Sequence, residues 1–165
     1  MMGPLPVLPR LALSVRQPWA WAIVHAGKDI ENRTRAAIRH NLDRRQRVAI
    51  HAAKGMTKAE YYDGARVKTE IFGSSAFPAD LRRGGIIGSI EITGSTDRSE
   101  NPWFFGPVGL TLARPEPALF VPALGWLGIF EWTAAGDDNI PEPAKWMVRR
   151  SNPESESVDS PAPPA

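Results

Sequence analysis

The chain has 165 residues and no cysteine, and its 20 Lys and Arg against 18 Asp and Glu give a formal net charge of +2. This length suits one domain with a sizeable core, and the lack of cysteine excludes disulfides, thiolate zinc sites and a cysteine nucleophile. No apolar run approaches the ~20 residues of a membrane-spanning helix. The composition therefore predicts a cytoplasmic protein that does not enter a membrane.

The first half of the chain carries clear local signals. Residues 1–10 form a Pro-rich leader that we expect to be flexible. Apolar residues alternate over 11–15, which predicts a strand, and Pro18 suits the first position of a helix. An apolar stripe at i, i+3, i+4 and i+7 from Trp19 predicts that helix, which Gly27 ends.

A polar connection over residues 34–46 comes next, with a turn of helix expected around residues 36–40. Alternating residues predict a strand over 47–52. Thr57 and Glu60 have the spacing of a capping box, and they predict a helix from Lys58 to about Phe72. Its modest apolar stripe favours a position on the domain surface.

The remaining predicted elements are mostly strands. Residues 85–93 alternate and contain two glycines, as curved strands do, and residues 108–113 form another strand that Pro115 and Pro117 are expected to break. A last strand is predicted over residues 125–132. Strands at this spacing with helices between them predict an α+β fold built on a mixed barrel.

Residues 135–165 differ in composition from the body of the chain. They are rich in Pro, Ser and acidic residues, which predicts a largely disordered tail. Residues 145–150 are its only apolar island, and we expect them to dock on the domain, with binding of a protein partner as the alternative.

Positive charge is concentrated in the body. Through residue 136 there are 17 Lys and Arg against 12 Asp and Glu, whereas the remainder has 3 against 6. Arginine presents a planar fork that suits phosphate, so the densest cluster indicates a nucleic-acid footprint; a solvated loop is the alternative. The cluster consists of Arg33, Arg35, Arg39, Arg44, Arg45 and Arg47.

Four ordered segments resemble one protein family. The segment GKDIENR (27–33) matches the signature G-x-K-x-x-E-x-R with one residue missing after the glycine, and LSVRQPWA precedes it. GIIGSIEIT, NPWFFGPVGLTL and ALGWLGIFEW follow at residues 85–93, 101–112 and 123–132. Residues 11–134 thereby resemble the ASCH (activating signal cointegrator homology) domain. The resemblance implies a PUA-like mixed β-barrel with a few peripheral helices and a cleft that holds RNA or a nucleoside.

The expected cleft is built around Lys28, Glu31 and Arg33. A desolvated lysine can act as a base or an electrostatic clamp, a carboxylate can orient it, and a guanidinium suits a phosphate or a base edge. The structural alternative is an ion pair between Glu31 and Arg33 that only closes the barrel. RNA or a nucleoside is the expected ligand, with DNA as an alternative partner. Further candidate ligand-binding residues are Arg16, Gln17, Trp19, Trp21, Arg44, Arg45 and Trp103.

Two other functions are compatible with these residues. Some ASCH-type proteins are amidohydrolases that act on N4-acetylcytidine with a lysine, a threonine three residues later and a glutamate, and others cleave RNA. The resemblance makes Lys28, Glu31 and Glu91 catalytic candidates, although Glu31 stands where the threonine would be. A coregulator-type protein-interaction module that acts through the tail is the third reading.

Other chemistries lack their motifs. The three histidines show no short ligand spacing, so neither a metal nor another cofactor is expected. No serine lies in a Gly-x-Ser-x-Gly turn, as it would in many hydrolases with a serine nucleophile.

Overall fold

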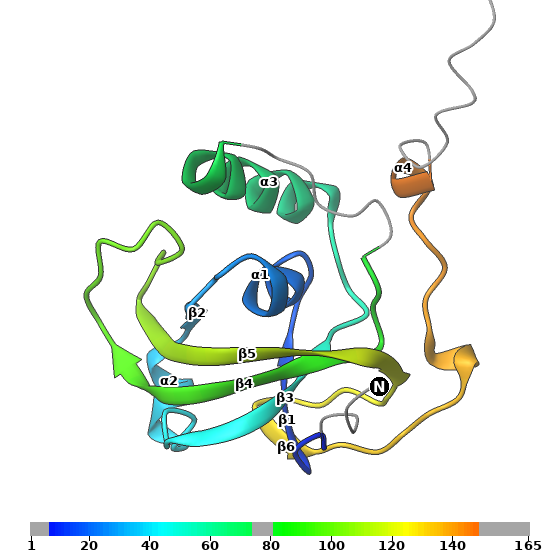
Figure 1. Cartoon of the computed structure of the whole chain (residues 1–165), viewed down its shortest axis with the longest axis horizontal. Coiled ribbons are helices and arrows are strands. Elements are labelled where there is room, and N and C mark those ends of the chain that lie inside the picture. Colours follow the sequence, from blue (N-terminus) through cyan, green and yellow to red (C-terminus); the bar gives the residue numbers. More distant parts are fainter. Residues whose placement is uncertain (1–6, 74–80, 149–165) are drawn as a thin grey trace, which may run out of the picture.

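The computed structural model describes residues 7–73 and 81–148. It is an α+β structure in which a six-stranded mixed sheet has the order β2-β5-β4-β3-β1-β6 (Figure 1). β1 and β3 are parallel, and the other neighbours are antiparallel. The strands are β1 (Leu11–Val15), β2 (Ile30–Arg33), β3 (Gln46–Ala52), β4 (Gly85–Thr96), β5 (Val108–Pro122) and β6 (Ile129–Glu131). The helices are α1 (Trp19–His25), α2 (Arg35–Arg39), α3 (Lys58–Phe72) and α4 (Lys145–Val148), with a 3-10 turn, η1, over Asp137–Asn139.

The predicted elements of the first half are confirmed. Gly27 follows α1 with a φ of 68°, which explains why a glycine ends this helix. Thr57 accepts a hydrogen bond from the backbone of Glu60, and the Glu60 side chain accepts one from the backbone of Thr57. The capping box therefore starts α3 as the sequence indicates.

The prediction that Pro115 and Pro117 end a strand is wrong. β5 continues through both prolines to Pro122 and pairs with β4 across several register shifts. β2 pairs with β5 only as far as Thr111, so one edge of β5 is free beyond that residue. A proline, which has no N–H to donate, is tolerated on such a free edge.

The last strand is also shorter than predicted. β6 spans only Ile129–Glu131, because Leu124 to Leu127 form an exposed loop and Gly128 adopts a φ of 65° before the strand begins. β6 then pairs with β1 alone.

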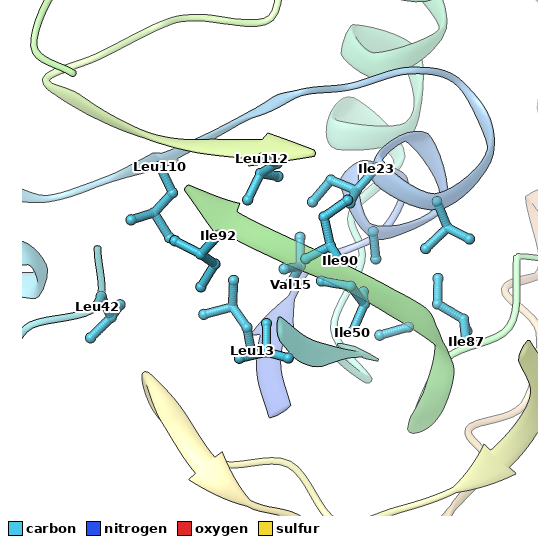
Figure 2. Packing of buried hydrophobic residues seen from close by; sticks show 14 residues of the cluster. Leu13, Val15, Ile23, Leu42, Ile50, Ile87, Ile90, Ile92, Leu110 and Leu112 are labelled. Atoms are coloured by element: carbon cyan, nitrogen blue, oxygen red, sulfur yellow. The ribbon is translucent and has the colours of Figure 1, made fainter. Parts of the chain in front are cut away.

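Helix α1 lies between the curved sheet and α3 (Figure 1). One side of α1 joins a core with residues of β1, β3, β4 and β5, of which Ile23, Leu13, Ile50, Ile90 and Leu112 are labelled in Figure 2. Ala22 and Ala26, on its other side, pack with Tyr61 and Val67 of α3. Burial on both sides is what lets a helix of 7 residues be stable.

The sheet has two edges, β2 and β6, so it is not closed into a barrel by strand pairing, and the predicted barrel is not confirmed. A side chain spans the gap instead. Arg33 of β2 donates from Nη2 to the carbonyl oxygen of Ser14 in β1 at 2.7 Å. We call this junction between β2 and β1, bridged by Arg33 and Ser14, the seam.

Ordered contacts continue past the predicted domain boundary at residue 134. The Asn139 amide is buried and donates to the carbonyl oxygens of Gly84 and Ala123 at 2.9 and 2.8 Å. Trp146 of α4 lies 5.1 Å from Tyr61 of α3, measured between ring centroids. The expected docking of the apolar island agrees with this contact, whereas residues 1–6 of the predicted leader and 149–165 of the predicted tail lie outside the described residues.

No helix in the described ranges has both the length and the apolar character needed to cross a membrane.

Candidate functional site

A cavity of about 330 Å³ opens at the seam. Backbone and side chains of β1, β2, the start of α1 and the loop before β5 form its wall. This seam cavity is lined by Ser14, Val15, Arg16, Trp19, Glu31, Asn32, Arg33 and Phe105. Of the predicted ligand-binding residues, the structure thus brings together Arg16, Trp19, Glu31 and Arg33.

Gln17 holds the chain where β1 turns into α1. It is 1% exposed, and its amide accepts from the backbone N–H of Trp21 and donates to the carbonyl oxygen of Arg82, each at 2.9 Å. Both polar atoms of this predicted ligand residue are therefore occupied by protein. Its effect on the site is to fix the helix start that carries Trp19.

Asn32 positions the other aromatic ring of the cavity. Its Oδ1 accepts from the backbone N–H of Phe105 at 2.8 Å and of Gly106 at 3.3 Å, and its Nδ2 donates to the carbonyl oxygen of Trp103 at 3.0 Å. The loop is thereby tied to β2. Phe105, 59% exposed, stands with its ring 6.2 Å from that of Trp19 at an interplanar angle of 63°.

Glu31 and Lys28 form a buried ion pair behind the cavity wall. The Lys28 Nζ lies 3.6 Å from the Glu31 Oε1, and the two side chains are 1% and 9% exposed. Lys28 also donates to the carbonyl oxygen of Ile30. Burial lowers the pKa of Lys28, although the charge of Glu31 opposes that shift.

Two buried polar atoms of the lining residues lack a hydrogen-bond partner among the described residues. They are the Oε2 of Glu31 and the Nε of Arg33. One can only accept and the other can only donate. Buried polar groups without a partner are rare, because each costs about 1–3 kcal/mol. The two atoms therefore distinguish this cavity as a candidate site for a polar ligand.

The ion pair expected between Glu31 and Arg33 is not formed in the described structure. Glu31 is paired with Lys28, and the guanidinium of Arg33 is bonded to the backbone of Ser14. The seam is therefore closed by a bond from a side chain to the backbone, and not by a salt bridge.

Other predicted site residues lie elsewhere. Trp103 is 2% exposed in the core between α1 and α3, so its ring is not available to a ligand. Trp21 lines a different cavity, of about 510 Å³, and Arg44 a third, of about 780 Å³ beside α2. Arg16 lines the seam cavity but is held by Glu60, with 2.6 Å between Nε and Oε1.

Glu91 is engaged by two arginines. Its carboxylate lies 2.5 Å from Arg114 and 3.1 Å from Arg45, and the hydrogen bond from Arg114 is the main cause that lowers its pKa. Neither Glu91 nor Lys28 lines the seam cavity. The structure does not assemble the predicted catalytic group of Lys28, Glu31 and Glu91 around that space.

The predicted list of binding residues omitted Ser14 and Asn32, and from the aromatic run before β5 it took Trp103 rather than its neighbour Phe105. Asn32 lies inside the matched signature, and Phe105 belongs to the run of aromatics before β5, so both stood beside recognised motifs. Their roles depend on one hydrogen-bonded contact between distant segments, which no local pattern reveals. In the described ranges, no group of three or more His, Asp or Glu is placed to hold a metal ion.

No protein-family model matches this chain, and no curated protein matches it.

Proposed function

We propose that this protein is an ASCH-type module of PUA-like architecture that binds a nucleobase, from RNA or from a nucleoside, in the seam cavity. The proposal rests on one observation: Glu31 and Arg33, which line the cavity together with Trp19 and Phe105, each have a buried polar atom, Oε2 and Nε, without a hydrogen-bond partner. The resemblance of residues 11–134 to the ASCH domain points to the same ligand class.

A nucleobase matches both features of the cavity. Its edge offers an amino or imino N–H to a carboxylate and a carbonyl or ring nitrogen to a guanidinium, while its faces pack on aromatic rings. The volume of about 330 Å³ lies at the small end of the ~300–1,000 Å³ range of ligand sites. That volume suits one nucleoside unit, and a longer strand would continue over the surface.

Exposed arginines of the cluster would bind the phosphates of a strand that continues over the surface. Arg44 is exposed, whereas Arg45 forms a salt bridge with Glu91. Phosphate contacts made by exposed arginines give an affinity that falls as salt rises, whereas base contacts in the cavity depend on salt much less.

Hydrolysis by Lys28 receives no support from this geometry. Its ammonium group is sealed from the cavity and committed to Glu31 and the Ile30 carbonyl. Binding is therefore the function that we propose for this site.

The test is titration calorimetry with the four ribonucleosides, N4-acetylcytidine and a short single-stranded RNA, at low and high salt. Phe105→Ala should weaken binding by about tenfold or more, because loss of a stacking ring costs about 1–3 kcal/mol. Tyr62→Ala, which removes an exposed aromatic from α3, is the matched control and should change nothing. Arg44→Glu should weaken RNA binding at low salt only. Equal affinity for the wild type and Phe105→Ala, or no binding at all, would overturn the proposal.

A further inference from the structure

A fourth cavity, of about 670 Å³, lies by Ser14 and His51. Leu13 and Val15 belong to the core under α1, so the alternation of β1 turns Ser14 to the opposite face. The strand register places His51 of β3 directly beside Ser14. We call it the Ser14–His51 cavity, and it is lined by Ser14, His51, Ala53, Lys54, Leu124, Gly125, Trp126, Leu127 and Asn139.

The hydrogen bonds of His51 fix which ring nitrogen carries the proton. Its Nε2 lies 2.8 Å from the carbonyl oxygen of Ala123, which can only accept, so Nε2 must carry the hydrogen. In the neutral ring Nδ1 is then an acceptor, and it lies 3.3 Å from the Ser14 Oγ. The hydroxyl of Ser14 therefore donates to an imidazole that a backbone carbonyl orients from behind.

Two neighbours support this arrangement. Asn139 donates to the same Ala123 carbonyl at 2.8 Å, which keeps that carbonyl in place. A Cβ at Gly125 would come within 2.8 Å of the His51 Cε1, so only glycine lets the loop approach the ring this closely. Burial, and more weakly the charge of Lys54, lower the pKa of His51, which keeps the ring neutral and able to accept a proton.

Three large apolar side chains of the wall are exposed. Leu124, Trp126 and Leu127 are 56%, 75% and 86% exposed. Large apolar side chains gathered beside a polar pair indicate a ligand with an apolar part. Lys54 adds a positive charge on the same wall.

We propose that Ser14 and His51 are the nucleophile and the general base of an acyl-transfer site, and that its substrate is a small carboxylic ester whose acyl chain packs on Trp126 and Leu127. A nucleophile, a base within hydrogen-bond reach and a group that orients the base form the minimal arrangement for this chemistry. This proposal does not rest on nucleobase binding in the seam cavity, although Ser14 lines both cavities.

The reaction proceeds in two balanced steps. In the first, the Ser14 Oγ bonds to the ester carbonyl carbon, its proton moves to the His51 Nδ1, and the C–O bond breaks as the alcohol leaves with that proton. In the second, the oxygen of a water bonds to the acyl carbon and gives a proton to Nδ1, which returns it to Oγ as the acyl–Oγ bond breaks. Lys54 would stabilise the oxyanion formed in each step.

The test treats the full-length protein with a fluorophosphonate and with p-nitrophenyl butyrate. We expect one phosphonyl adduct, located on Ser14 by peptide mass spectrometry, and ester hydrolysis that falls at least about 100-fold in Ser14→Ala and in His51→Gln. Ser95→Ala removes an exposed serine that is hydrogen-bonded to Asp43, and it should keep full activity. Trp126→Ala should raise KM for the butyrate ester more than for the acetate ester.

Thermal unfolding of each variant separates loss of the reaction from loss of the fold, and Ser14→Ala, which removes one oxygen, keeps the test meaningful if His51→Gln is unstable. An adduct on a different residue, or hydrolysis that is equal in the wild type and Ser14→Ala, would overturn the proposal.

Discussion

Lys28 shows how one residue can matter for a site without touching its ligand. Its side chain is only 1% exposed. An ammonium group is costly to bury unless it is paired. The Glu31 Oε1 at 3.6 Å and the Ile30 carbonyl supply that pairing. Lys28 therefore pairs with the Oε1 of Glu31, while the Oε2 of the same carboxylate has no hydrogen-bond partner among the described residues.

The Lys28→Met substitution should destabilise the protein by about 3–5 kcal/mol, because it leaves the Glu31 carboxylate buried without its cation. The double variant Lys28→Met with Glu31→Leu removes both charges and should recover most of that loss, since well-packed apolar residues often replace a buried ion pair at little cost. Urea denaturation gives both free energies of unfolding. A double variant no more stable than Lys28→Met alone would contradict the compensation between the two charges.

At the scale of elements, the site depends on how β2 is held. β2 has only 4 residues and pairs through its backbone with β5 alone. Its side chains bond to two other segments. Arg33 donates to the backbone of β1 across the seam, and Asn32 accepts from the loop that carries Phe105. Asp29, just before β2, accepts from Asn101 at 2.5 Å and ties the same loop a second time.

Asn32→Ala should weaken nucleoside binding by about as much as Phe105→Ala, because the amide acts by positioning that ring. The combined variant should then be no worse than either single one, since two changes that break the same contact are not additive. Calorimetric titration of the three variants completes the cycle, and their thermal unfolding separates positioning from a general loss of stability. Losses that add fully would show that Asn32 acts on the ligand independently of Phe105.

Local sequence signals were sufficient to predict most helices and strands, but not how the strands pair or which distant residues meet. The helix between Pro18 and Gly27 and the helix that the Thr57 capping box starts each rest on local signals, and both are confirmed. β5 runs through Pro115 and Pro117 because its neighbour β2 ends early, which is a property of another segment. The seam cavity and the Ser14–His51 contact likewise depend on residues 19 to 73 positions apart.

At the scale of the whole molecule, the chain after β6 returns to lock the sheet. The Asn139 amide bonds the carbonyl oxygens of Gly84 and Ala123, at the ends of β4 and β5, and Trp146 packs on α3. Arg83 adds a bond from its Nη2 to the carbonyl oxygen of Glu142 at 3.0 Å. Residues 135–148 are thus a strap that joins the two ends of the domain.

Truncation after residue 136 should lower the free energy of unfolding by several kcal/mol relative to truncation after residue 148. The shorter chain loses the Trp146 contact and both hydrogen bonds of the buried Asn139 amide, each worth about 0.5–1.5 kcal/mol, although the Gly84 carbonyl keeps the N–H of Ala123. Asn139→Ala in the full chain measures the hydrogen-bonded part alone and should fall between the two truncations. Chemical denaturation followed by tryptophan fluorescence ranks the three proteins. If the protein truncated after residue 136 were as stable as the full chain, residues 135–148 would not stabilise the domain. A role for them in binding a protein partner would then be favoured.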